Sequence, residues 1–251
     1  MPSFQRRTIY VGPHDLKNLN RSFPGKRGGT VTERIAAALT DAVITKADYL
    51  IDIHAGDGNE GLRPSYSAYY AEAGGPAVIR ESERLARAFG LDYIVLFRGQ
   101  VSSPQQAIYT SAQAVANGIP AIDIESGELG RRSDEYVRPI VSGVYNVLAA
   151  LKMLPGAAAT VSEPLYIRDR ARVYSDHDGI WYPSDLVRPG DFVTTGQELG
   201  YITDYHGKRL MTVAAPANGI LLIRFGSPPV NRGDNLIVIG AVDGRSSAES
   251  N

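Results

Sequence analysis

Tyr49-Leu50-Ile51-Asp52-Ile53-His54 is an apolar run, interrupted by one aspartate, that leads directly into the glycine-rich loop Ala55-Gly56-Asp57-Gly58. The pattern predicts a buried strand that ends in a histidine at a sheet edge, where open α/β folds gather ligands and metals. Asp52 and His54 are two residues apart on a strand, so their side chains share a face. His54 is therefore either a metal ligand, with Asp52 supporting its ring, or a hydrogen-bonded residue at a strand end; the first alternative needs further protein ligands.

A second strand-like run ends in the same way. Ala121-Ile122-Asp123-Ile124-Glu125 is followed by Ser126-Gly127. Parallel strands that end in ionisable residues bring them to one sheet edge, so we expect Glu125 near His54. A glutamate there can act as a general base. The alternative is a solvated glutamate in a loop, and Asp123, which points to the same face, competes for the role.

A third candidate is the element Leu19-Asn20-Arg21-Ser22-Phe23-Pro24-Gly25. Its Asn20 and Arg21 offer an amide donor and a two-pronged guanidinium, a combination that suits a substrate carboxylate. The alternative is an ordinary basic loop, because several lysines and arginines lie nearby in the sequence.

The first part of the chain alternates strand-like and helix-like patterns. Helices are predicted after a capping box at 30–33, and over 76–89, 103–116 and 134–154; further strands are predicted at 67–70 and 93–97. This alternation predicts an α/β fold with a mainly parallel or mixed sheet flanked by helices.

From residue 161 onward, short apolar runs alternate with turn signals and no helix is predicted. A weak repeat relates 179–191 to 219–234, which suggests two similar halves of a barrel-sandwich. We therefore predict an α/β domain over 1–158, an all-β domain over 159–243 and a disordered tail over 244–251.

Composition limits the function classes. The 251 residues carry a net charge of −1, so nothing favours nucleic acid or a membrane as a partner. The absence of cysteine excludes disulfides and thiolate chemistry and leaves His, Asp and Glu as metal ligands. The N-terminus lacks the apolar run of a signal peptide, and a cytoplasmic location is expected.

Together, the Asn20-Arg21 element, Asp52-Ile53-His54 and the run ending at Glu125 resemble the succinylglutamate desuccinylase/aspartoacylase family, zinc hydrolases related to the zinc carboxypeptidases. The resemblance implies that His54 is a zinc ligand, that Glu125 is the general base, and that Asn20 and Arg21 bind a small-molecule carboxylate substrate. Asp52 would support the His54 ring without a catalytic role of its own. The all-β domain resembles biotinyl/lipoyl carrier domains.

The chain departs from this family pattern in one respect. Members carry a His-x-x-Glu motif that supplies two zinc ligands, whereas the histidines here are His14, His54, His177 and His206, none of which begins such a motif. We therefore expect an α/β domain that is incomplete at its N-terminus. Two functions follow: a zinc-dependent deacylase that cleaves an N-acyl amino acid or a related amide or ester, or a non-catalytic relative that acts as a carboxylate-binding or structural module. The oligomeric state is left open, with a homo-oligomer as one alternative.

Overall fold

Five strands form the sheet that carries the predicted site residues. The computed structural model describes residues 2–156 and 163–242, and the predicted tail at 244–251 lies outside them. The strands follow the order β1 (Leu50–His54), β5 (Ala121–Glu125), β3 (Tyr66–Tyr70), β4 (Tyr93–Phe97) and β6 (Leu165–Ile167). Neighbouring strands run parallel except β3 and β5, which are antiparallel. Within the described chain, β1 therefore forms one edge of this sheet.

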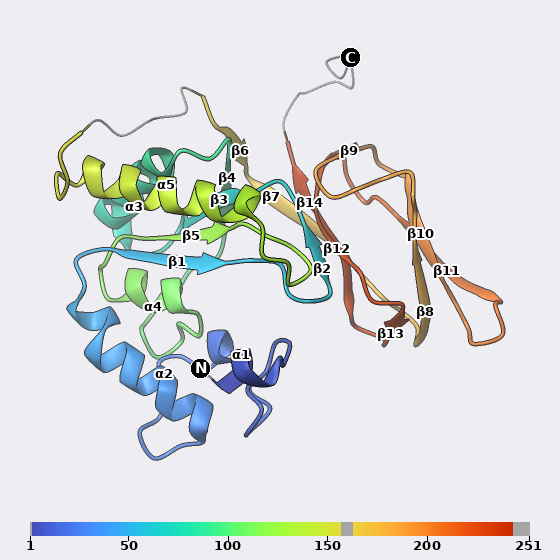
Figure 1. Cartoon of the computed structure of the whole chain (residues 1–251), viewed down its shortest axis with the longest axis horizontal. Coiled ribbons are helices and arrows are strands. Elements are labelled where there is room, and N and C mark those ends of the chain that lie inside the picture. Colours follow the sequence, from blue (N-terminus) through green and yellow to red (C-terminus); the bar gives the residue numbers. More distant parts are fainter. Residues whose placement is uncertain (1, 157–162, 243–251) are drawn as a thin grey trace.

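Helices cover both faces of the sheet (Figure 1). On one face, α3 (Gly75–Phe89) and α5 (Asp134–Ala150) pack against apolar side chains of β5 and β4, such as Ile122 and Leu96. On the other face lie α2 (Val31–Ala42) and α4 (Thr110–Ala116), with the short α1 (Pro2–Arg6) and the turns η1 (Leu19–Arg21) and η2 (Ile44–Lys46). The predicted mixed α/β fold with flanking helices is confirmed. In the described residues, no helix combines the length and apolar character needed to cross a membrane.

One predicted helix begins later than its sequence suggests. The Ser103-Pro104 signal predicts a start at residue 103, but α4 begins only at Thr110. The side chain of Gln113 explains the difference, because its Nε2 donates hydrogen bonds to the carbonyl oxygens of Pro104 and Ala107. These bonds hold the preceding segment as a turn rather than as a helical extension.

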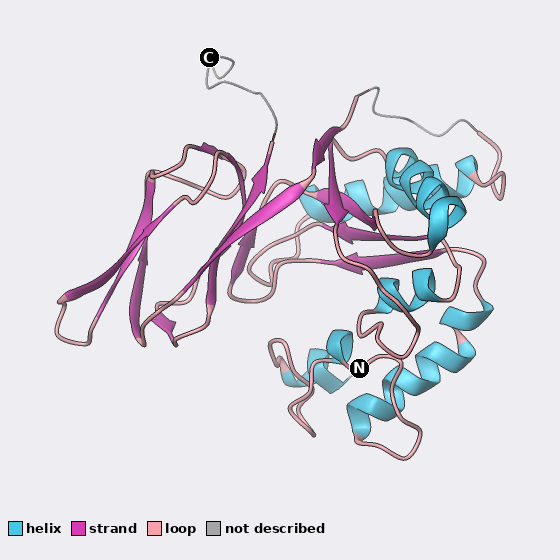
Figure 2. Ribbon diagram, turned by 180° about the vertical axis from the view of Figure 1, so that it is seen from behind, coloured by secondary structure: helices cyan, strands magenta, loops and turns pink. Residues whose placement is uncertain are grey.

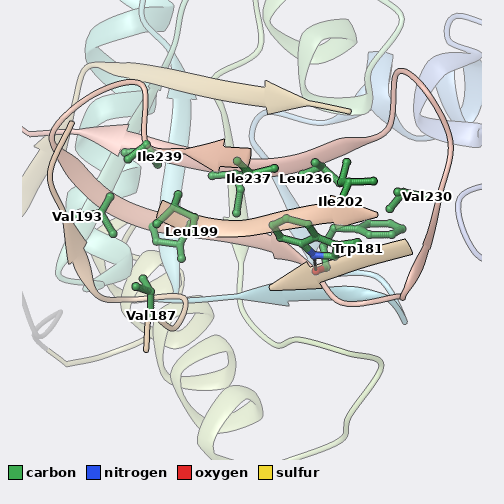
Figure 3. Close-up of a cluster of buried hydrophobic side chains, with 13 residues drawn as sticks. Trp181, Val187, Val193, Leu199, Ile202, Val230, Leu236, Ile237 and Ile239 are labelled. Carbon is green, nitrogen blue, oxygen red and sulfur yellow. Dashed lines mark hydrogen bonds between the residues drawn. The ribbon is translucent and has the colours of Figure 1, made fainter. Parts of the chain in front are cut away.

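The second part of the chain is all-β over its described residues, as predicted (Figure 2). One of its sheets has the order β11 (Arg209–Ala214), β10 (Glu198–Thr203), β8 (Gly179–Pro183) and β13 (Pro229–Val230). The other contains β12 (Gly219–Phe225), β14 (Asn235–Ala241) and β7 (Asp169–Tyr174), with β9 (Phe192–Val193) paired to β12. The two sheets enclose a core around Trp181, Leu199, Ile202 and Ile237 (Figure 3). The finer barrel-sandwich likeness stays a prediction.

The two parts of the chain exchange strands. The short β2 (Glu60–Leu62) comes from the first part but pairs with β12, whereas β6 comes after the predicted domain boundary and pairs with β4. Side chains from both parts form one buried cluster, to which Tyr66, Ala68 and Val95 contribute from the first sheet and Ile220 and Leu222 from β12. The all-β part is thus fixed against the sheet face that also bears the site residues.

Candidate active site

Four ionisable side chains project from one face of the first sheet at neighbouring positions. In the parallel pair β1–β5, Asp52 is the Cα partner of Asp123, and His54 is the Cα partner of Glu125. Residues that are directly opposite or two apart point to the same side of a sheet. The adjacent residues Ile51, Ile122 and Ile124 belong to the hydrophobic core beneath α3 and α5. The alternation of the strands therefore separates a polar site from the core.

Three of these residues form a group that could hold a metal ion. One ligand atom each from Asp52, His54 and Asp123 lies within 4.8 Å of the others. His54 Nε2 is 2.9 Å from Asp52 Oδ2 and 3.7 Å from Asp123 Oδ1. One imidazole nitrogen and two carboxylates are donors that zinc accepts.

Asp123 supports this interpretation. Its Oδ1 accepts a hydrogen bond of 2.9 Å from Ser111 Oγ at the start of α4. Its Oδ2 is buried and has no hydrogen-bond partner among the described residues. A buried carboxylate oxygen without a partner is costly, and a cation bound beside it would remove that cost. The donor set therefore fits a divalent metal.

The local charges shift the pKa values of the group. Burial alone would lower the pKa of His54, but the hydrogen bond with Asp52 and the surrounding carboxylate charges raise it to about 9. Burial and the charge of Asp52 raise the pKa of Asp123 to about 7. Burial also raises the pKa of Glu125 to about 7, although the charge of His54 acts in the opposite direction. Glu125 can thus accept and release a proton near neutral pH.

The site opens into a cavity of about 1060 Å³. Its walls come from the N-terminal segment, α2, the start of α4, the β1–β2 loop and the strands of both parts of the chain. His54 and Glu125 line it together with Asn20 and Arg21 of η1. The structure therefore brings the predicted site residues to one cavity, and their roles stay predictions.

Asn20 and Arg21 are held in defined positions at this cavity. Asn20 Oδ1 accepts hydrogen bonds from the backbone nitrogen and the hydroxyl of Thr110, at 2.8 and 3.1 Å. With its oxygen engaged, Asn20 retains its amide NH₂ as a donor. The guanidinium of Arg21 lies over the ring of Tyr109, 4.4 Å from the centroid. The start of α4 therefore orients both residues.

Several residues at the site were missed by the sequence-based prediction. Asp123 was recognised only as a competitor of Glu125, although its position opposite Asp52 makes it a candidate metal ligand. Arg170 and Arg172 line the same cavity from β7, in the all-β part. Their alternation in Arg170-Ala171-Arg172 indicates one shared face, but the sequence does not indicate that this face meets the cavity.

Comparison with known proteins identifies relatives of this chain. A protein-family model described as the succinylglutamate desuccinylase/aspartoacylase catalytic domain matches residues 2–151. The N-alpha-acetyl-L-2,4-diaminobutyric acid deacetylase of Halomonas elongata is 28% identical over 238 residues, which cover 92% of this chain and 67% of that protein.

Solved structures share the architecture. A succinylglutamate desuccinylase/aspartoacylase from Rhodobacter sphaeroides superposes with a TM-score of 0.81 and 25% identity, over 95% of this chain and 72% of the other. The product-bound ectoine utilization protein EutE (DoeB) from Ruegeria pomeroyi gives a TM-score of 0.84 at 24% identity, over 96% of this chain and 72% of the other. The second match, at 24% identity, shows only that the fold is shared.

Proposed function

The chain belongs to the succinylglutamate desuccinylase/aspartoacylase family, and from this premise we propose that it is a zinc-dependent deacylase that hydrolyses an N-acyl amino acid. The observation that carries the proposal is the placement of Glu125 directly beside the Asp52–His54–Asp123 group, at one cavity. Zinc held by these three residues would supply Lewis-acid chemistry toward the acyl carbonyl.

Glu125 is the proton carrier in this proposal. Its carboxylate lines the cavity beside the metal group, so it can take a proton from the water as the water oxygen bonds to the acyl carbon. The same carboxyl group then returns a proton to the amine nitrogen as the bond between carbon and nitrogen breaks. The products are the free acid of the acyl group and the free amino acid.

Asn20 and Arg21 would position the substrate. Arg21, stacked on Tyr109, presents a cation to the substrate carboxylate, while the amide NH₂ of Asn20 donates to an oxygen of the substrate. These two contacts would fix the orientation of the substrate, so that its acyl carbonyl lies at the metal group and beside Glu125. The relative in Halomonas elongata makes N-acetyl-L-2,4-diaminobutyrate the first substrate to test. The absence of cysteine favours a cytoplasmic location.

One observation favours the alternative function, a non-catalytic module that binds carboxylates or has a structural role. The candidate metal group contains a single histidine, and the sequence has no His-x-x-Glu motif. A chain with this donor set that bound no metal would act as a carboxylate-binding or structural module.

One experiment separates the two. The purified chain is assayed for bound zinc and for release of amino acid from N-acetyl-L-2,4-diaminobutyrate, N-acetyl-L-aspartate and N-succinyl-L-glutamate, before and after treatment with a chelator. If the protein is a zinc-dependent deacylase, it should contain about one zinc ion per chain. Hydrolysis should stop when the chelator removes the zinc and should return when zinc is added back. A protein that binds an acyl amino acid but neither retains zinc nor hydrolyses any substrate would establish the non-catalytic module instead.

A further inference from the structure

Strand β7 brings two arginines from the all-β part of the chain to the substrate cavity. Arg170 and Arg172 alternate with Ala171 and Val173 along β7. Val173 packs against the hydrophobic core of the all-β part, so the two arginines project from the opposite side of the strand. Both line the cavity that contains His54 and Glu125.

Arg170 is held in place by aromatic rings rather than by acids. Its guanidinium carbon lies 4.5 Å from the ring centroid of Phe97, the last residue of β4. Phe97 meets Tyr70 edge to face at 5.4 Å, so the ring that supports the cation is itself fixed. A guanidinium stacked in this way keeps its N–H donors at the ring's rim free for a planar anion.

Arg170 has no directly bonded acidic partner in the described part of the chain, although the charge of Glu125 acts on it across the cavity. Among the residues that the structure describes, its side chain forms no hydrogen bond or ion pair with an acid. The neighbouring Arg98, in contrast, pairs with Glu72 at 3.0 Å and with Asp169 at 3.4 Å. Arg170 is half-buried, and a half-buried cation without a bonded acid loses hydration that a bound anion would replace.

We propose that β7 supplies a carboxylate-binding point to the substrate cavity, with Arg170 as the principal ligand and Arg172 beside it. This inference rests on the proposed function and adds to it a contact from the all-β part, beyond Arg21 of η1. The exchange of β2 and β6 between the sheets holds β7 against the cavity. In this proposal the all-β part contributes residues to the substrate site in addition to its structural role.

The test compares two probes that differ only in the carboxylate, N-acetyl-L-2,4-diaminobutyrate and its primary carboxamide. Their dissociation constants are measured by calorimetry on the Glu125→Gln protein, so that the result does not depend on turnover. With Arg170 present, the acid binds about 10- to 100-fold more tightly than the amide, as expected for a hydrogen-bonded charge pair. Arg170→Met lowers this preference by about 10-fold without abolishing it, because Arg21 keeps its own contact with the carboxylate. Arg170→Lys and Arg172→Gln lower it by less.

Arg168→Gln is the matched control, because Arg168 is exposed, precedes Arg170 by two residues and does not line the cavity. It should leave both dissociation constants unchanged. The proposal is overturned if Arg170→Met keeps the preference for the acid undiminished, or if the protein with Arg170 intact binds the acid no better than the amide. If Arg170→Met does not fold, the dissociation constants of the acid and the amide are compared in Arg170→Lys and Arg172→Gln instead. An undiminished preference for the acid in both variants would overturn the proposal. Failure of hydrolysis alone would count against the deacylase but not against this contact.

Discussion

His54 and Glu125 are direct partners across the parallel strands β1 and β5, and both line the same cavity. Glu125 is therefore the last residue of a strand and not a solvated loop residue. Its burial raises its pKa, while the charge of His54 lowers it, so the proton affinity of the carboxyl group depends on the state of its neighbour. In the proposed deacylase, this pairing would place the proton carrier next to the metal group.

Replacing Glu125 by glutamine should remove catalysis without removing metal. The amide cannot carry the proton, so we expect kcat to fall by about 10²- to 10⁴-fold. Zinc content and melting temperature should match those of the unmodified protein, because Glu125 is not among the three candidate ligands. Glu163→Gln, at an exposed position, serves as the control. Unchanged turnover in Glu125→Gln would assign the proton transfer to another residue.

Asp123→Asn tests the metal group itself. The amide keeps the size of the side chain but removes one anionic donor next to His54, so zinc affinity should fall by about 10- to 100-fold or more. Competition with a chromogenic chelator measures this loss. The exposed Asp48→Asn controls for the change in net charge. Equal zinc affinity in the two variants would show that Asp123 does not contact the metal.

The sequence predicts the local elements well because their signals are local. Thr30 and Glu33 form the expected helix start, with Thr30 N–H donating to Glu33 Oε2 at 2.8 Å. The apolar alternation likewise locates β1 and β5. The pairing of β2 with β12 has no such signal, because a three-residue strand finds its partner only through tertiary packing. For the same reason the sequence could place His54 and Glu125 at one edge but could not bring Arg170 to them.

Stability should fall in acid partly through Glu128. Its Oε1 accepts hydrogen bonds from Tyr136 at 2.9 Å and from Arg63 at 3.1 Å. Burial alone would raise the pKa of Glu128, but these bonds outweigh it and hold the pKa below 4.5. A carboxyl group with a lowered folded-state pKa stabilises the protein above its unfolded pKa, and this contribution is lost as the pH falls through the folded value.

Melting temperatures between neutral and acidic pH check this effect. Glu128→Gln should be less stable than the unmodified protein at neutral pH, and the difference should shrink as the pH falls below 4.5. Glu163→Gln should follow the unmodified protein throughout. A stability difference that stays constant with pH would exclude this contribution of Glu128.

Gly143 in α5 is required by its contact with Phe89. A Cβ at position 143 would overlap the buried Phe89 ring, so Gly143→Ala should destabilise the protein by about 1–3 kcal/mol despite the better helix propensity of alanine. Ser142→Ala, at the adjacent exposed position, should be neutral or slightly stabilising. Denaturant unfolding measures both. Stabilisation by Gly143→Ala would mean that Phe89 moves aside without cost.

The two parts of the chain should unfold together, because each contributes a strand to the other's sheet. The only tryptophan, Trp181, is 1% exposed in the all-β core and donates to the carbonyl of Phe225, so its fluorescence reports on that part. Far-UV circular dichroism reports mainly on the helices of the other part. We expect coincident transitions, and Leu62→Ala in β2 should shift both by about 2–5 kcal/mol, whereas Leu186→Ala, at 92% exposure, should shift neither. Separate transitions would mean that the exchanged strands do not couple the two parts.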